Sequence, residues 1–221
     1  MSGVLRLAPF LLALLVASCA GLPPIAPDAA MDRSADPARV YPQGSWQFLH
    51  SLQAEMPGGR QLGLLGLTVL SSTDRRHRSV LMTIEGFVLF DGESESDRLT
   101  VHRALPPFDS PHFAAGLMED IRLVFMEPEG PTVAMGRLEA GGRVRRVRAA
   151  GGTVDVETLS NGDWRIRQYD ASDRLLRTVM ARRGLGDIAG FPQWVELTAA
   201  GGQDYKITMT LLEAVPIAPV F

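Results

Sequence analysis

The stretch Tyr205-Lys206-Ile207-Thr208-Met209-Thr210-Leu211 alternates apolar and polar side chains without interruption. Successive side chains of a β-strand point to opposite faces, so this order puts the apolar residues in one row and the polar residues in the other. Such a strand has one face in the core and one face in water. The pattern therefore predicts an antiparallel sheet with one apolar face and one wet face.

Further segments of this kind are separated by turn residues such as Gly58-Gly59 and Asn161-Gly162, which supply the positive φ that tight hairpins need. The eleven predicted strands cover residues 44–55, 61–71, 79–90, 97–103, 132–140, 143–149, 153–160, 164–169, 174–182, 193–199 and 205–214. Because most connections have hairpin length, we expect a mainly β (α+β) fold with a largely antiparallel sheet. A sheet this wide curls around its apolar face, which predicts a strongly curved half-barrel.

Residues 110–125 break the alternation and predict a helix. Ser110 suits the N-cap, and Pro111 suits the first helical position. Apolar residues follow at helical spacing, namely Phe113, Leu117 and Ile121. An alternative assigns residues 121–126 to a strand. We expect the helix to cover the concave face of the sheet, with Glu119 and Asp120 on its solvated side.

The first residues have the features of a secretory signal. Arg6 is followed by an apolar run over residues 7–17, which is too short to span a bilayer. The run ends in Val16-Ala17-Ser18-Cys19, which resembles the lipobox of bacterial lipoproteins. That resemblance implies cleavage before Cys19, acylation of its thiol and amine, and anchoring in a membrane. The alternative is an ordinary buried cysteine.

The residues after the cysteine indicate a destination and a tether. Ala20 stands where, in enterobacterial lipoproteins, an Asp favours retention in the inner membrane, so the resemblance implies a periplasm-facing lipoprotein of the outer membrane. The following segment is rich in Ala, Pro and Asp, and it is either a semi-extended tether or partly packed along the domain. The predicted organisation is a signal peptide (1–18), an acylated cysteine and tether (19–43), a half-barrel (44–214) and a C-terminal tail (215–221).

Composition and motifs exclude several classes of function. A formal net charge of −3 is not that of a strongly basic nucleic-acid binder. One cysteine and four scattered histidines predict neither a disulfide nor a metal site, and we expect no cofactor. Asp109, Ser110 and His112 crowd at a helix start, where capping explains them better than catalysis. His50 and Ser51 point to opposite faces of a strand, so we expect no enzyme.

Charged residues concentrate in two places. His77 lies in a polar cluster over residues 74–78, for which we expect an exposed turn. An arginine-rich patch comprises Arg143, Arg145, Arg146, Arg148, Arg165 and Arg167. Either it is the solvated face of a sheet, balanced by Asp155, Glu157 and Asp163, or it contacts anionic lipid headgroups.

Several segments carry a family resemblance. Residues 191–197 (FPQWVEL) followed by 205–209 (YKITM) are similar to the closing hairpin of the LolA/LolB-like group of periplasmic lipoprotein carriers and receptors. Residues 84–91 (IEGFVLFD) and 105–109 (LPPFD) resemble LolA-like lipoproteins more than the well-known receptor. With the lipobox, the strands and the helix, the resemblance extends over roughly residues 44–214. In that group, a half-barrel covered by helices holds acyl chains in an apolar cavity.

The resemblance implies an outer-membrane-anchored lipoprotein that binds acyl chains of a lipoprotein or lipid, for transfer or insertion at the envelope. It also implies a periplasmic donor protein as a partner, and no nucleic acid. The candidate cavity residues are apolar residues of the helix and the strands: Leu81, Met82, Ile84, Phe87, Leu89, Phe113, Leu117, Ile121, Trp164, Ile166, Met180, Met209 and Leu211. The alternative is a non-catalytic envelope scaffold without a ligand cavity.

Overall fold

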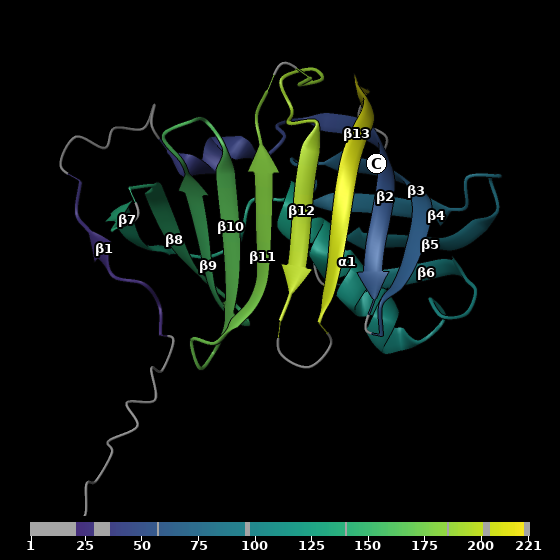
Figure 1. Ribbon diagram of the computed structural model, residues 1–221, viewed down its shortest axis with the longest axis horizontal. Helices are drawn as coiled ribbons and strands as arrows, with labels where there is room; N and C mark the ends of the chain where they lie inside the picture. The colour runs from purple at the N-terminus through teal and green to yellow at the C-terminus, as the bar shows by residue number, and fades with distance from the viewer. Residues whose placement is uncertain are drawn as a thin grey trace, which may run out of the picture.

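The computed structural model describes residues 21–28, 36–56, 58–95, 98–139, 141–184, 186–200 and 204–218. These residues form one 13-stranded antiparallel sheet in the order β1-β7-β8-β9-β10-β11-β12-β13-β2-β3-β4-β5-β6 (Figure 1). The sheet does not close, so β1 and β6 are its two edges. The predicted signal peptide and Cys19 lie outside the described residues.

The strands follow one another along the chain with a single α-helix, α1, between β6 and β7. Their bounds are β1 (Ile25–Ala26), β2 (Ser45–Met56), β3 (Arg60–Ser71), β4 (Arg76–Met82), β5 (Val88–Glu95), β6 (Arg98–Ala104), β7 (Thr132–Leu138), β8 (Arg143–Ala149), β9 (Gly152–Thr158), β10 (Trp164–Asp170), β11 (Leu175–Arg182), β12 (Trp194–Ala199) and β13 (Tyr205–Pro216).

The mainly β, antiparallel half-barrel is confirmed, but the sheet has 13 strands and not eleven. One extra strand arises because the predicted strand 79–90 is divided into β4 and β5. The chain turns between them, where Gly86 has a φ of +90° and the amide of Thr83 donates to the carbonyl of Phe87 at 2.9 Å. The other extra strand, β1, comes from the segment predicted as a tether.

The sheet curls around its apolar face, and α1 lies within the curve. In Figure 1, β8–β13 and β2 run upright, β4–β6 run across them, and α1 lies behind the upright strands. The larger core cluster joins the upright strands to the C-terminal half of α1, with Phe48, Ile166 and Phe125 among its members. A smaller cluster joins β3–β5 to the N-terminal half of α1 through Phe90 and Met118.

The helix begins where the sequence predicts it. α1 spans Pro111–Phe125, and the Ser110 hydroxyl accepts a hydrogen bond from the Phe113 amide at 3.1 Å. The capping interpretation of Ser110 is therefore confirmed, and the assignment of residues 121–126 to a strand is wrong. No helix among the described residues is long and apolar enough to cross a membrane.

Two parts of the segment before β2 pack on the sheet. Residues 21–28, which we call the N-terminal strap, include β1, whose Ile25 pairs with Leu138 at the edge of β7. The Arg146 guanidinium donates to the Pro23 carbonyl at 2.9 Å. A short 3-10 helix, η2 (Pro37–Val40), is followed by Tyr41, whose side chain is buried in the larger cluster. These parts therefore lie along the domain.

The strap depends on a close backbone approach at Gly136. A Cβ at this position would overlap the carbonyl oxygen of Ala26. We therefore expect Gly136→Ala to release the strap and to accelerate amide exchange over residues 21–28, measured by hydrogen–deuterium exchange with mass spectrometry. Gly63→Ala is the matched control, because a Cβ at Gly63 has nothing within 4 Å. Unchanged exchange in the Gly136→Ala strap would contradict this packing.

Candidate functional site

The space between α1 and the concave face is the interior in which the sequence predicts an apolar cavity. A cavity of about 50 Å³ remains there. Small-molecule sites usually measure about 300–1,000 Å³, so this conformation accommodates no acyl chain and has room only for water. The cavity is lined by His50, Leu52, Gly66, Thr68, Ser79, Leu81, Leu117, Asp120, Ile121, Val124, Phe125, Leu197, Ile207 and Met209.

Most of the predicted cavity residues face this space. Those on the concave side of the strands are buried, namely Leu81, Trp164, Ile166, Met209 and Leu211. Phe113, Leu117 and Ile121 are half-buried on α1 and pack against the smaller cluster, as does Leu89. Of all these residues, only Leu81, Leu117, Ile121 and Met209 line the remaining cavity.

Four of the candidate residues lie elsewhere. Met82 and Met180 are on the convex face, the face away from α1, because they pair with Leu65 and Arg165 of that face. Ile84 is 75% exposed and Phe87 is 71% exposed, because both stand at the turn between β4 and β5. Ile84 and Phe87 belong to the predicted strand 79–90, and the alternating faces of a strand do not continue through a turn.

The cavity wall also has polar groups, which were not among the predicted cavity residues. The hydroxyls of Thr68 and Ser79 lie 3.0 Å apart and share a hydrogen bond. His50 of β2 also lines the cavity, and its ring lies beside the stacked rings of Phe48 and Phe125. The sequence did contain a signal for His50. It stands two residues after Phe48, so both side chains point to the same, apolar face of β2.

Asp120 corrects the expectation of a solvated helix face. Its side chain accepts hydrogen bonds from the Arg177 guanidinium and the Tyr205 hydroxyl, and the residue is only 6% exposed. Burial raises the pKa of the Asp120 carboxyl, and Arg177 and Tyr205 oppose that rise. Asp120 follows Leu117 by three residues, so it lies on the covered side of the helix.

A chain of hydrogen bonds continues from this carboxylate along the helix. Arg177 donates to the side-chain oxygen of Gln168 at 3.1 Å, and the Gln168 amide donates to Glu119 at 3.0 Å. Glu119 in turn pairs with Arg122 at 2.6 Å. The middle of α1 is therefore tied by polar contacts to β10, β11 and β13, next to the apolar contacts of the two core clusters.

The expectation of an exposed turn at His77 is wrong. His77 lies on β4, is 1% exposed and is covered by α1. Burial lowers its pKa to about 4, against an opposing hydrogen bond to the backbone of Met118. Burial also lowers the pKa of His50 to about 4.

The arginine patch is divided between the two faces of the sheet. Arg146 lies on the convex face and donates twice to the buried Asp155, at 2.7 and 2.8 Å. Arg145 lies on the opposite face and pairs with Asp36 at 3.4 Å and with Glu127. Asp163 bonds to the Asn161 side chain. The carboxylates that balance the convex arginines are therefore buried beneath them, which alternation along single strands does not indicate.

No family model matches this sequence, and no curated protein matches it. Among solved structures, a LolA superfamily protein from Nitrosomonas europaea superposes with a TM-score of 0.55 at 12% identity, over 82% of this chain and 90% of its own. The fold is LolA-like. A DUF1329 family protein from Desulfovibrio piger has a TM-score of 0.50 at 8% identity, over 84% of this chain and 90% of its own. The resemblance to the LolA/LolB-like group that the sequence predicts is thus confirmed for the fold.

The two buried histidines make the protein sensitive to acid. Each binds a proton near pH 4 when folded and near pH 6.5 when unfolded, so stability falls as the pH drops from about 6.5 towards 4. Asp120 acts in the opposite direction, because its raised folded pKa adds stability as the pH falls through it.

We expect the substitution His50→Leu to reduce the loss of unfolding free energy between pH 7 and pH 5 by about 2 kcal/mol. Urea unfolding at both pH values measures this. The control is Gln53→Leu, because Gln53 is an exposed residue of the same strand and carries no titratable group, and this variant should lose as much stability between pH 7 and pH 5 as the unmodified chain. An equal loss in the His50→Leu variant would contradict a neutral, buried His50.

Proposed function

We propose that this protein is an envelope lipoprotein that binds the acyl chains of a lipoprotein or lipid between α1 and the concave face of its sheet. The observation that carries the proposal is the LolA-like sheet, whose apolar face is covered by one helix. Binding of this kind needs apolar area and no catalytic group or cofactor. Each square ångström of apolar surface removed from water contributes about 25 cal/mol.

An acyl chain enters this interior when α1 moves away from the sheet. Met118, Val124 and Phe125 of α1 then exchange their contacts with the sheet for contacts with the chain, which are equally apolar. Such an exchange leaves the buried apolar area nearly unchanged. The flexible side chains of Met118 and Met209 adapt to different acyl chains. The polar contacts at Asp120 stay on the side of β11 and β13, where they hold α1 near the sheet.

The anchor is the second part of the proposal. Acylation at Cys19 after removal of residues 1–18 holds the domain at the outer membrane, facing the periplasm. Residues 19–43 then connect the anchor to a half-barrel over residues 44–214, followed by a short tail. A periplasmic donor protein brings the lipid cargo.

One observation favours a second candidate function, a non-catalytic envelope scaffold. The interior retains only about 50 Å³, which is the filled core that a scaffold would have. A scaffold forms a stable complex with another envelope protein and binds no acyl chain. Binding of an acyl-chain probe therefore separates the two functions.

The decisive variant is Gly66→Val, on the cavity wall. A Cβ there lies 2.9 Å from the flexible end of Leu52 and 3.6 Å from Leu81, so the valine occupies the cavity. We expect the dissociation constant of a dansylated fatty acid to rise at least about tenfold, or about 1.4 kcal/mol. Titration of a chain that begins at Ala20 measures it, because all described contacts lie within residues 21–218.

Gly63→Val is the control on the same strand, because a Cβ at Gly63 has nothing within 4 Å. This variant should bind the probe like the unmodified chain. Thermal unfolding of both variants establishes that they fold, and mass spectrometry of the purified chain identifies co-purified lipid. Failure of the unmodified chain to bind the probe or any lipid would overturn acyl-chain binding in favour of the scaffold.

A further inference from the structure

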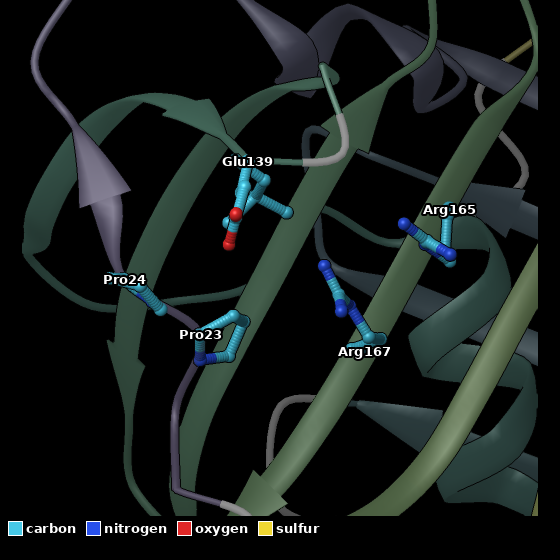
Figure 2. Close-up of a pocket in the computed structure, with 6 residues that line it drawn as sticks. Pro23, Pro24, Glu139, Arg165 and Arg167 are labelled. Atoms are coloured by element: carbon cyan, nitrogen blue, oxygen red, sulfur yellow. The ribbon is translucent and has the colours of Figure 1, made fainter.

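A second and larger cavity lies on the convex face, away from the interior. It is a groove of about 390 Å³ between the N-terminal strap, the end of β7 and strand β10 (Figure 2). Its walls are Pro23, Pro24, Leu138, Glu139, Arg165 and Arg167. The volume lies within the range of small-molecule sites. Neither the fold nor the proposed acyl-chain binding accounts for this groove.

One wall of the groove carries an excess of positive charge. Arg165 lies 2.7 Å and Arg167 lies 3.2 Å from the same oxygen of Glu157, a residue that is 0% exposed. Two guanidiniums thus share one carboxylate. The Nε of Arg167 is buried without a hydrogen-bond partner among the described residues. The neighbouring Asp155 is bound twice by Arg146 and does not neutralise this wall.

The facing wall carries a negative charge. Glu139, in the turn after β7, directs its carboxylate into the groove, and the guanidiniums of Arg165 and Arg167 point towards it from β10 (Figure 2). Among the described residues, Glu139 is exposed and forms no ion pair. Pro23, Pro24 and Leu138 are the apolar residues among those that line the groove. The groove therefore has a positively charged wall, a negatively charged wall and some apolar lining.

We propose that this groove binds a phosphoethanolamine headgroup. The phosphate lies against Arg165 and Arg167, because guanidinium groups bind phosphate through paired, charge-assisted hydrogen bonds. The primary ammonium lies against Glu139, and the glycerol carbons contact Pro23 and Leu138. A choline headgroup fits less well, because quaternary ammonium groups are recognised by aromatic side chains and none lines this groove.

The source of this headgroup is the membrane surface. Three residues separate Cys19 from Pro23, and each of the four Cα-to-Cα steps spans at most about 3.5 Å, so an acylated Cys19 lies within about 14 Å of the groove. This step rests on the anchoring in the proposed function. The strap, bonded to Arg146 and to β7, then holds the convex face towards the lipid headgroups. The headgroup contact orients the domain on its membrane.

The test uses the chain from Ala20 onward, titrated calorimetrically with sn-glycero-3-phosphoethanolamine and with glycerol 3-phosphate. We expect Glu139→Gln to weaken binding of the ethanolamine ester about tenfold and to leave binding of glycerol 3-phosphate unchanged. Arg167→Gln should weaken both at least about tenfold. Arg148→Gln is the control, because Arg148 is an exposed arginine of β8 that does not line the groove.

Arg167 contacts the buried Glu157, so its variant is interpreted only with a thermal unfolding curve, whereas Glu139 is exposed and its variant keeps the proposal testable. Absence of binding to the ethanolamine ester, or no effect of Glu139→Gln on it, would overturn the proposal. In vesicle flotation, phosphatidylethanolamine vesicles should bind more chain than phosphatidylcholine vesicles. Equal binding to both kinds of vesicle would refute the claim that the groove binds this headgroup at a membrane surface. Glycerophosphoethanolamine and glycerol 3-phosphate contain no acyl chain, so the calorimetric outcome is independent of the fatty-acid titration.

Discussion

The apolar concave face of an unclosed sheet has to be covered, and α1 is the element that covers it. An antiparallel sheet that closed into a barrel would bury this face by itself, whereas here both edge strands stay apart. The two core clusters therefore meet on α1, through Met118 on one side and Phe125 on the other. The position of one helix decides whether the interior is a core or a binding site.

A buried carboxylate gives this cover a defined position. Apolar contacts between a helix and a sheet are not directional, whereas Asp120 must keep Arg177 and Tyr205 as partners or remain a buried, unpaired charge. The apolar contacts on either side of it have no such restriction.

The convex face differs from the concave face, because its buried side chains include carboxylates that are paired with arginines. Asp155 and Glu157 lie beneath arginines of β8 and β10, and one of these arginines, Arg146, also donates to the strap at the Pro23 carbonyl. The pairing is unequal at Glu157, which leaves positive charge on the wall of the groove. The two faces thus differ in chemistry, because the concave face is apolar and the groove on the convex face is lined by side chains of both charges.

The sequence by itself determined the antiparallel sheet and the helix, because the alternation in residues 205–211 and the cap at Ser110 are local features that act wherever the segment lies. Only the tertiary structure decided that His77 and Asp120 are buried, because α1 and the strands that cover them are distant in sequence. The same holds for the small interior and for the convex groove, since volume depends on how separate segments meet. Periodicity indicates which side of a strand is apolar, and only packing establishes whether any space is left beside it.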